Sequence, residues 1–277
     1  VAEDIEKEID YFYSLPTKLQ KDVLKASRSH LTSLNRVLVI TSIFFQDHQK
    51  ASTIAHKNLE LTKKIYDINN IEDKEYYLGA YYQLVMSYML AGNSRELIFY
   101  FNQWKNVAVE IVNTPEGAHA IGTQASFFAP ILINLGLFNE TEELVTFVNK
   151  NINFGSSHFD KMQKSFFDYA AGKISMMKKD YKKAVKYLEA SSKLFLDNPN
   201  SDIATAVSAQ ATMTLLEAYY LKGDMKNYNK HFSLLTGYKP DNYYFASEFS
   251  PQKHFFIPKG QILAAAYTVF DYNINKG

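Results

Sequence analysis

The sequence predicts an all-α fold built from a stack of helical hairpins, and three observations support this prediction. Apolar residues recur with helical spacing through most of the 277 residues. Short turns rich in glycine and polar residues interrupt these segments at nearly even intervals. The stretch 164–200 combines both features, because it reads as a helix, a tight turn and a second helix that ends before Pro199. Such a hairpin buries its apolar face by packing against copies of itself.

The hairpin at 164–200 sets the register for the others. Gly172 lies where two helices would pack closely, Lys179-Asp180-Tyr181 makes the turn, and Ala184 sits where the second helix presses on the first. Residues that match Ala184 recur along the chain at Ala51, Leu97, Thr141 and Tyr228. The five positions are separated by 46, 44, 43 and 44 residues. A spacing this even predicts five hairpins of one kind.

The small and large apolar residues of this hairpin resemble those of the tetratricopeptide (TPR) repeat family, of the type found in bacterial sensors and regulators. The resemblance implies an all-α, right-handed α-solenoid of about five to six TPR-like helical hairpins with a period of about 44 residues. It implies one helical-repeat domain over residues 1–277. Its parts would be an N-terminal cap at 1–27, five hairpin repeats at 28–236, and an aromatic and proline-rich segment with a closing helix at 237–277.

Helical spacing also predicts the first elements of the chain. An acidic helix is expected over residues 2–13. Residues 34–45 are nearly all apolar and β-branched, so on their own they would also allow a buried strand. The repeat register assigns them to the first helix of a hairpin, with 48–68 as its second helix. The next hairpin takes residues 73–90 and, after a turn, the residues up to about Val112.

Capping residues and prolines indicate where the following helices begin. Three pairs have the spacing of a capping box: Thr17 with Gln20, Asn93 with Glu96, and Asn139 with Glu142. The third hairpin is predicted to begin at Thr114-Pro115-Glu116, where a capping residue precedes a proline. Pro130 falls inside the helical pattern that follows. It either kinks that helix or marks a helix boundary.

The fifth hairpin takes residues 201–221 and 224–235, and the composition changes after Thr236. Residues 237–260 hold three prolines and seven aromatic residues, a mixture that suits no regular element. This segment would either wrap over the end of the hairpin stack, which we favour, or offer an aromatic surface to a partner. A last helix is predicted at residues 262–272.

Composition excludes several classes of function. The formal net charge is +1, from 30 basic and 29 acidic residues, which argues against a broad electrostatic surface for nucleic acid or anionic lipid. The chain has no cysteine, which excludes disulfides, thiolate catalysis and cysteine-ligated metals. No apolar run approaches the roughly 18 residues of a membrane span. We therefore expect no direct nucleic-acid binding by this region, no membrane insertion, and a cytoplasmic location, with a periplasmic or extracytoplasmic one as the alternative.

Motifs typical of catalysis or metal binding are missing from the sequence. It contains no phosphate-binding loop, no zinc-protease motif, no nucleophile elbow and no EF-hand loop. The closest histidines, His48 and His56, would lie about 12 Å apart along one helix, too far for a single metal ion. We interpret them as surface or interface residues. The sequence thus predicts no enzymatic activity, no cofactor and no metal.

In TPR proteins the first helix of each hairpin lines a concave groove, and the resemblance transfers those positions to this chain. It implies a ligand- or peptide-binding groove made of Arg36, Tyr82, Met86, Asn134, Tyr169, Lys173, Met176, Met213, Glu217 and Tyr220. The same register adds Phe44, Met89, Ser126, Met177 and Gln210. Methionine and aromatic side chains would supply adaptable contact area, and the polar residues would fix orientation. For each methionine, the alternative is that it fills irregular space between helices.

These features favour a non-enzymatic module that binds a peptide or protein segment, with a homodimer as an option. A resemblance to peptide-responsive bacterial regulators implies the ligand-sensing region of a signalling protein that also carries a DNA-binding domain. One alternative is the extracytoplasmic sensor region of a histidine kinase. Two others are a structural scaffold subunit of a larger assembly, and an enzyme whose active-site residues are dispersed along the chain.

Overall fold

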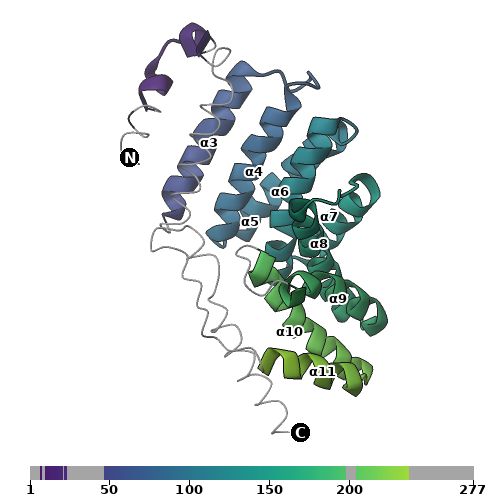
Figure 1. Cartoon of the computed structure of the whole chain (residues 1–277). Coiled ribbons are helices and arrows are strands. Elements are labelled where there is room, and N and C mark those ends of the chain that lie inside the picture. Colours follow the sequence, from purple (N-terminus) through teal and green to yellow (C-terminus); the bar gives the residue numbers. More distant parts are fainter. Residues whose placement is uncertain (1–6, 8–9, 21, 24–46, 198–203, 237–277) are drawn as a thin grey trace. The chain divides into compact units, whose positions relative to one another are not determined.

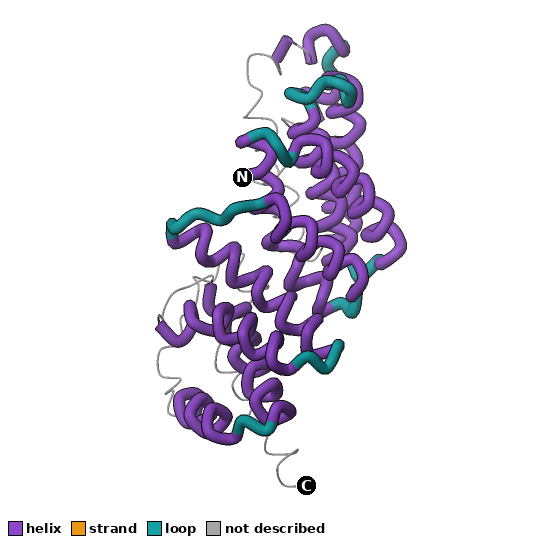
Figure 2. Tube along the Cα trace, turned by 90° about the vertical axis from the view of Figure 1, so that its right-hand side faces the viewer, coloured by secondary structure: helices purple, strands orange, loops and turns teal. Residues whose placement is uncertain are grey.

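The computed structural model describes residues 7, 10–20, 22–23, 47–197 and 204–236 (Figure 1). Every regular element in these ranges is a helix and none is a strand (Figure 2), so the predicted all-α class is confirmed. The chain separates into two compact units, Val1–Ile121 and Gly122–Gly277. Three predicted features lie outside the described residues: the helix at 34–45 with Arg36 and Phe44, the aromatic and proline-rich segment, and the closing helix.

The first unit is organised around the helix α4. Short helical segments at 10–14 and 17–20 precede α3 (His48–Ile65), α4 (Lys74–Leu90) and α5 (Ser94–Ile111). On α3, buried residues recur three and four positions apart, which gives this helix one apolar face. Helix α4 packs against both α3 and α5. On α5, Phe101 and Trp104 are fully buried, with ring centroids 6.0 Å apart.

In the second unit, α8 and α10 each pack against several helices. The elements are α7 (Phe138–Asn151), α8 (His158–Met177), α9 (Tyr181–Asp197), α10 (Ala204–Lys222) and α11 (Met225–Thr236). Helix α8 packs against α7, α9 and α10, while α10 also packs against α9 and α11. Helix α6 (Pro115–Asn134) begins in the first unit and ends in the second.

Four of the turns between helices have the same backbone geometry. One residue in each has a positive φ: Gly92 at 69°, Gly136 at 79°, Lys179 at 58° and Gly223 at 78°. In the α8–α9 turn, the Lys179 N–H donates to the Met176 carbonyl and the Asp180 N–H to the Ser175 carbonyl, both at 2.9 Å. The same pair of bonds closes the other three turns. This is the Schellman ending of a helix, in which a left-handed residue satisfies the last carbonyl groups.

The residues that the sequence aligned with Ala184 are equivalent in the structure. Ala51, Leu97, Thr141, Ala184 and Tyr228 each occupy the fourth position of their helix and are at most 5% exposed. Each N–H donates to the carbonyl of the residue just before its helix. The predicted turns at 92–94, 136–138, 179–181 and 223–225 are therefore confirmed. The right-handed solenoid with its period of about 44 residues stays a prediction.

Lys179 is the one turn residue among the four that is not glycine, which gives a direct test of this geometry. Lys179→Gly is expected to raise the free energy of unfolding by about 1 kcal/mol, because glycine adopts a positive φ without the clash of a Cβ atom. Gly223→Ala is the matched control and is expected to lower the free energy of unfolding by a similar amount, because alanine is strained at a φ of 78°. Nothing lies within 4 Å of the added Cβ, so this loss would come from the backbone alone. Urea unfolding measures both. A destabilised Lys179→Gly variant would contradict the shared turn.

One predicted helix start needs correction, and the structure decides between the two alternatives for Pro130. Asn139 with Glu142 does not form a capping box, because α7 is preceded by Leu137 and has no side-chain cap. The side chain of Glu142 instead accepts a hydrogen bond from Lys178. Pro130 lies inside α6, so it does not mark a helix boundary. A complete capping box that the sequence analysis did not predict joins Ser157 with Asp160 at the start of α8.

The capping prediction at Asn93 is confirmed in part, and one predicted helix is shorter than expected. The Asn93 side chain accepts a hydrogen bond from the Glu96 N–H at 3.4 Å. Helix α3 ends at Ile65 instead of residue 68. Tyr66 follows in an extended conformation, and its ring stacks on the ring of Tyr76 with centroids 3.9 Å apart. This contact fixes the entry of the chain into the loop before α4.

Candidate functional site

The ten predicted groove residues fall into three groups. Arg36 lies outside the described residues. Tyr82 and Met86 lie on α4 in the first unit, and both are partly buried. The other seven lie in the second unit at the end of α6 and along α8 and α10: Asn134, Tyr169, Lys173, Met176, Met213, Glu217 and Tyr220. The structure therefore brings most of the predicted set into one unit.

Asn134, the last residue of α6, joins α8 to α10 through its side-chain amide. Its Oδ1 atom accepts hydrogen bonds from the Tyr169 hydroxyl at 2.9 Å and from Lys173 Nζ at 3.2 Å. Its Nδ2 atom donates to Oε1 of Gln210 on α10 at 3.3 Å. We call these four residues the Asn134 cluster. Three helices that are separate in sequence thus contribute polar atoms to one place.

Lys173 is the charged member of the Asn134 cluster and is half-buried. Its Nζ atom lies 5.6 Å from the centre of the Tyr169 ring, within the range of a cation–π contact. Burial lowers the pKa of Lys173, and the negative charge of Glu217 acts in the opposite direction. Lys173 forms no ion pair with a carboxylate of any other described residue. Its ammonium group therefore keeps N–H donors that a ligand can use.

Tyr169 contributes to the cluster from the core of the unit. The side chain is 2% exposed, so it does not lie on the surface as the groove prediction expected. Burial raises the pKa of Tyr169 strongly, although the hydrogen bond with Asn134 acts in the opposite direction. The hydroxyl therefore stays protonated at neutral pH and serves as a donor that holds Asn134 in place.

The remaining predicted residues share helix faces with the cluster. Tyr169, Lys173 and Met176 follow one another at spacings of four and three on α8, and Gln210, Met213, Glu217 and Tyr220 follow at three, four and three on α10. Met176 and Met213 are partly exposed, Glu217 is exposed, and Tyr220 is 60% exposed. This face therefore combines one half-buried cation, one exposed acid and adaptable apolar side chains.

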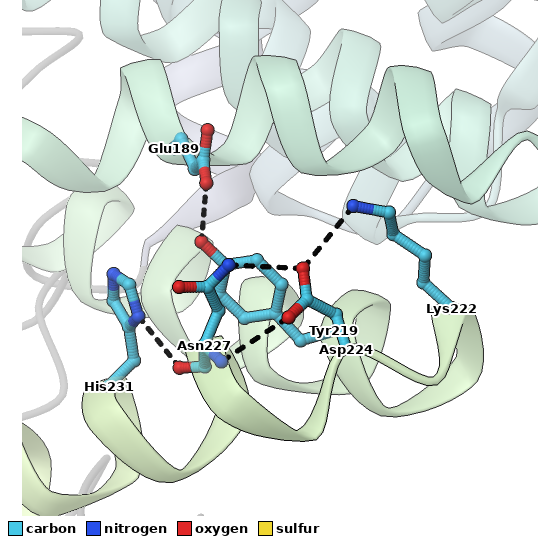
Figure 3. Close-up of polar contacts among 6 residues, drawn as sticks. All are labelled: Glu189, Tyr219, Lys222, Asp224, Asn227 and His231. Carbon is cyan, nitrogen blue, oxygen red and sulfur yellow. Dashed lines mark hydrogen bonds and ion pairs between the residues drawn. The ribbon is translucent and has the colours of Figure 1, made fainter.

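A second polar network, which the sequence analysis did not predict, lies among α9, α10 and α11 (Figure 3). The hydroxyl of Tyr219, a fully buried residue, donates to Glu189 on α9 at 2.5 Å. The Tyr219 ring lies 5.1 Å from the His231 ring on α11. Burial raises the pKa of Tyr219, and the hydrogen bond with the Glu189 carboxylate raises it further. Tyr219 therefore links three helices as a neutral donor.

The other contacts in Figure 3 are local to α11 and the turn before it. Asp224 accepts hydrogen bonds from the Asn227 N–H at 3.3 Å and from Asn227 Nδ2 at 3.0 Å, which caps α11. Lys222 lies 3.3 Å from the same carboxylate. The hydrogen bond from the Asn227 side-chain amide holds the pKa of Asp224 below its ordinary value. These bonds cap the start of α11.

The two histidines that the sequence placed on one helix both lie on α3 and have no metal-binding geometry. His56 Nε2 lies 2.8 Å from the Tyr88 hydroxyl, and the His56 ring meets the Tyr100 ring edge-on at 5.6 Å. Within the described ranges, no group of three or more histidine, aspartate or glutamate residues could hold a metal ion. None of the helices described there is long and apolar enough to cross a membrane.

The fold and the cluster together define an all-α helical protein in which polar side chains of three helices meet on one face. Comparison with known proteins found no match among family models, curated proteins or solved structures. The resemblance to TPR proteins therefore remains a prediction from sequence.

Proposed function

We propose that this chain is a non-enzymatic, TPR-like α-solenoid that binds a peptide or protein segment on the face formed by α6, α8 and α10. The observation that carries the proposal is the Asn134 cluster, in which half-buried Lys173 is bound by a neutral amide oxygen. The recurring Schellman turns support the repeat architecture, because each of the four is followed by a helix whose fourth residue is buried. In this proposal the module is the sensing region of a bacterial regulatory protein in the cytoplasm.

The chemistry of the face favours an extended ligand with both polar and apolar groups. Lys173 and Gln210 offer hydrogen-bond donors, while exposed Glu217 offers an acceptor for a cationic or amide group. Met176 and Met213 are flexible and polarizable, so they can fit side chains of different shape. Orientation would come from the charged groups and contact area from the thioethers and Tyr220.

A selection with random ten-residue peptides on the full chain tests this function. Peptides retained by the wild-type chain are expected to lose roughly tenfold or more in affinity for Lys173→Met, because a charge-assisted hydrogen bond to a partly buried lysine contributes about 1.5–3 kcal/mol. Methionine keeps the length of the side chain without its charge. Isothermal titration calorimetry with one selected peptide gives the dissociation constants.

Lys161→Met is the matched control, because Lys161 is an exposed lysine near the start of the same helix and outside the face. It is expected to leave peptide affinity unchanged. The proposal is wrong if no peptide is retained by the wild-type chain, or if Lys173→Met and Lys161→Met bind the selected peptide equally well.

A further inference from the structure

The turns after α8 and α10 carry a concentration of lysines that the Asn134 cluster does not use. Between residues 178 and 186 the chain has five exposed lysines and a single acid, Asp180. The turn after α10 and the start of α11 add three exposed lysines, Lys222, Lys226 and Lys230. Lys178 binds Glu142 and Lys222 pairs with Asp224. The other six form no ion pair with another described residue: Lys179, Lys182, Lys183, Lys186, Lys226 and Lys230. We call these six the lysine surface.

The two turns lie at the same end of their helices. Lys173 is close to the last residue of α8 and Glu217 is close to the last residue of α10, and the charge of Glu217 acts on Lys173. Since α8 and α10 also pack against each other, the two helices run side by side and end on the same side of the unit. The lysines of the two turns therefore contribute to one region of positive potential.

Large apolar side chains are exposed at the same two turns. Met177 is 50% exposed at the end of α8, and Leu221 and Met225 are 45% and 44% exposed on either side of the α10–α11 turn. Leaving such side chains in water costs free energy that contact with an apolar phase would recover. The lysine surface is therefore bordered by groups that suit an interface between water and hydrocarbon.

We propose that the lysine surface, with Met177, Leu221 and Met225, docks the protein peripherally on an anionic lipid membrane. The basic groups are all lysines, and the second unit contains no arginine. Lysine acts as a mobile point charge, which suits a diffuse negative surface, whereas the planar guanidinium of arginine suits fixed phosphates and carboxylates. Clustered lysines attract anionic lipids additively, and neighbouring apolar side chains can enter the headgroup region.

The start of α7, at the preceding turn, is negatively charged, so we expect the membrane to contact only the turns after α8 and α10. The start of α7 carries Glu140, Glu142 and Glu143, and a negative membrane would repel them. Glu142 is offset by its contact with Lys178. The overall net charge of +1 does not report this separation, because the three glutamates lie at the start of α7 and the six lysines at the turns after α8 and α10. Local charge density, not total charge, is what supports the inference.

Co-sedimentation of the full chain with lipid vesicles tests the docking surface. Vesicles of phosphatidylcholine with 30% phosphatidylserine are expected to bind the wild-type chain, and pure phosphatidylcholine vesicles are not. The variant Lys182→Gln/Lys183→Gln/Lys226→Gln is expected to reduce the partition coefficient on the anionic vesicles roughly a hundredfold. Each lysine is expected to contribute a factor of about five, and the three factors multiply. The variant Lys64→Gln/Lys150→Gln/Lys161→Gln removes the same charge from exposed positions elsewhere and is expected to change it little.

A second variant separates lipid from other anions. Met177→Ser/Met225→Ser should weaken binding to the anionic vesicles but leave retention on heparin, a soluble polyanion, unchanged. The proposal is overturned if the wild-type chain binds both vesicle types equally or neither, or if the two triple variants lose the same affinity. It is also overturned if the methionine variant keeps full vesicle binding, because the surface would then recognise negative charge of an acidic protein or nucleic acid alone.

Discussion

Replacing Gly172 with alanine is expected to lower the free energy of unfolding by about 1–3 kcal/mol, even though alanine is the better helix former. A Cβ atom at this position would lie 2.6 Å from Cγ and 2.7 Å from Cδ2 of Leu188. Leu188 is fully buried, and its Cγ atom cannot move without shifting the helix or the side chain as a whole. The close packing of α8 on α9 that the sequence predicted at Gly172 therefore depends on the missing side chain.

A double-mutant cycle isolates this contact. Leu188→Ala alone is expected to cost about 2–5 kcal/mol, because it leaves a cavity. Gly172→Ala/Leu188→Ala should cost less than the sum of the two single variants, since the added methyl group enters the space that leucine vacated. Gly122→Ala is the comparison, because its Cβ would lie 3.3 Å from the terminal Cγ2 of Ile152 and should be tolerated better. Additive effects in chemical unfolding would contradict the close contact.

Tyr169→Ala is expected to lower the free energy of unfolding by about 3–5 kcal/mol, which places Tyr169 in the core. Tyr220→Ala is expected to change it by no more than about 0.5 kcal/mol, because Tyr220 is 60% exposed. Tyr169→Phe keeps the ring and removes the donor to Asn134. We expect a loss of about 1 kcal/mol for that variant, the usual value for one hydrogen bond.

Thermal and urea unfolding of the three variants distinguish the two tyrosines. Peptide binding is informative only for Tyr220→Ala and Tyr169→Phe, since the fold is retained in both. Equal stability of Tyr169→Ala and the wild-type chain would show that Tyr169 is a surface residue after all.

The groove prediction shows where helical spacing is informative and where it stops. Spacing placed Tyr169 and Lys173 on one face of α8, and this arrangement is present. It did not distinguish buried Tyr169 from exposed Tyr220, because both are tyrosines on the first helix of a predicted hairpin. Tyr169 forms a hydrogen bond with Asn134 at the end of α6, 35 positions earlier in the chain, and no local signal near Tyr169 indicates that neighbour.

The network around Tyr219 could not be predicted for the same reason. Its partner Glu189 lies 30 positions earlier in the chain, and helical spacing alone assigns Glu189 to a solvated face. The Gly223-Asp224 turn before α11 was predicted, and Asp224 is indeed a cap of that helix. The cap is a local signal, whereas the contact with Glu189 is set by the packing of α9 on α10.

The sequence by itself determined the helices, the turns and the close approach at Gly172. Each depends on residues within a few positions of one another: apolar spacing, a left-handed residue that ends a helix, or a missing side chain. The tertiary structure alone decided which side chains meet. Asn134 and Gln210 are 76 positions apart, and Asn134 and Tyr169 are 35 apart. Hydrogen bonds and burial across such separations follow from how whole helices pack, which no short stretch of sequence encodes.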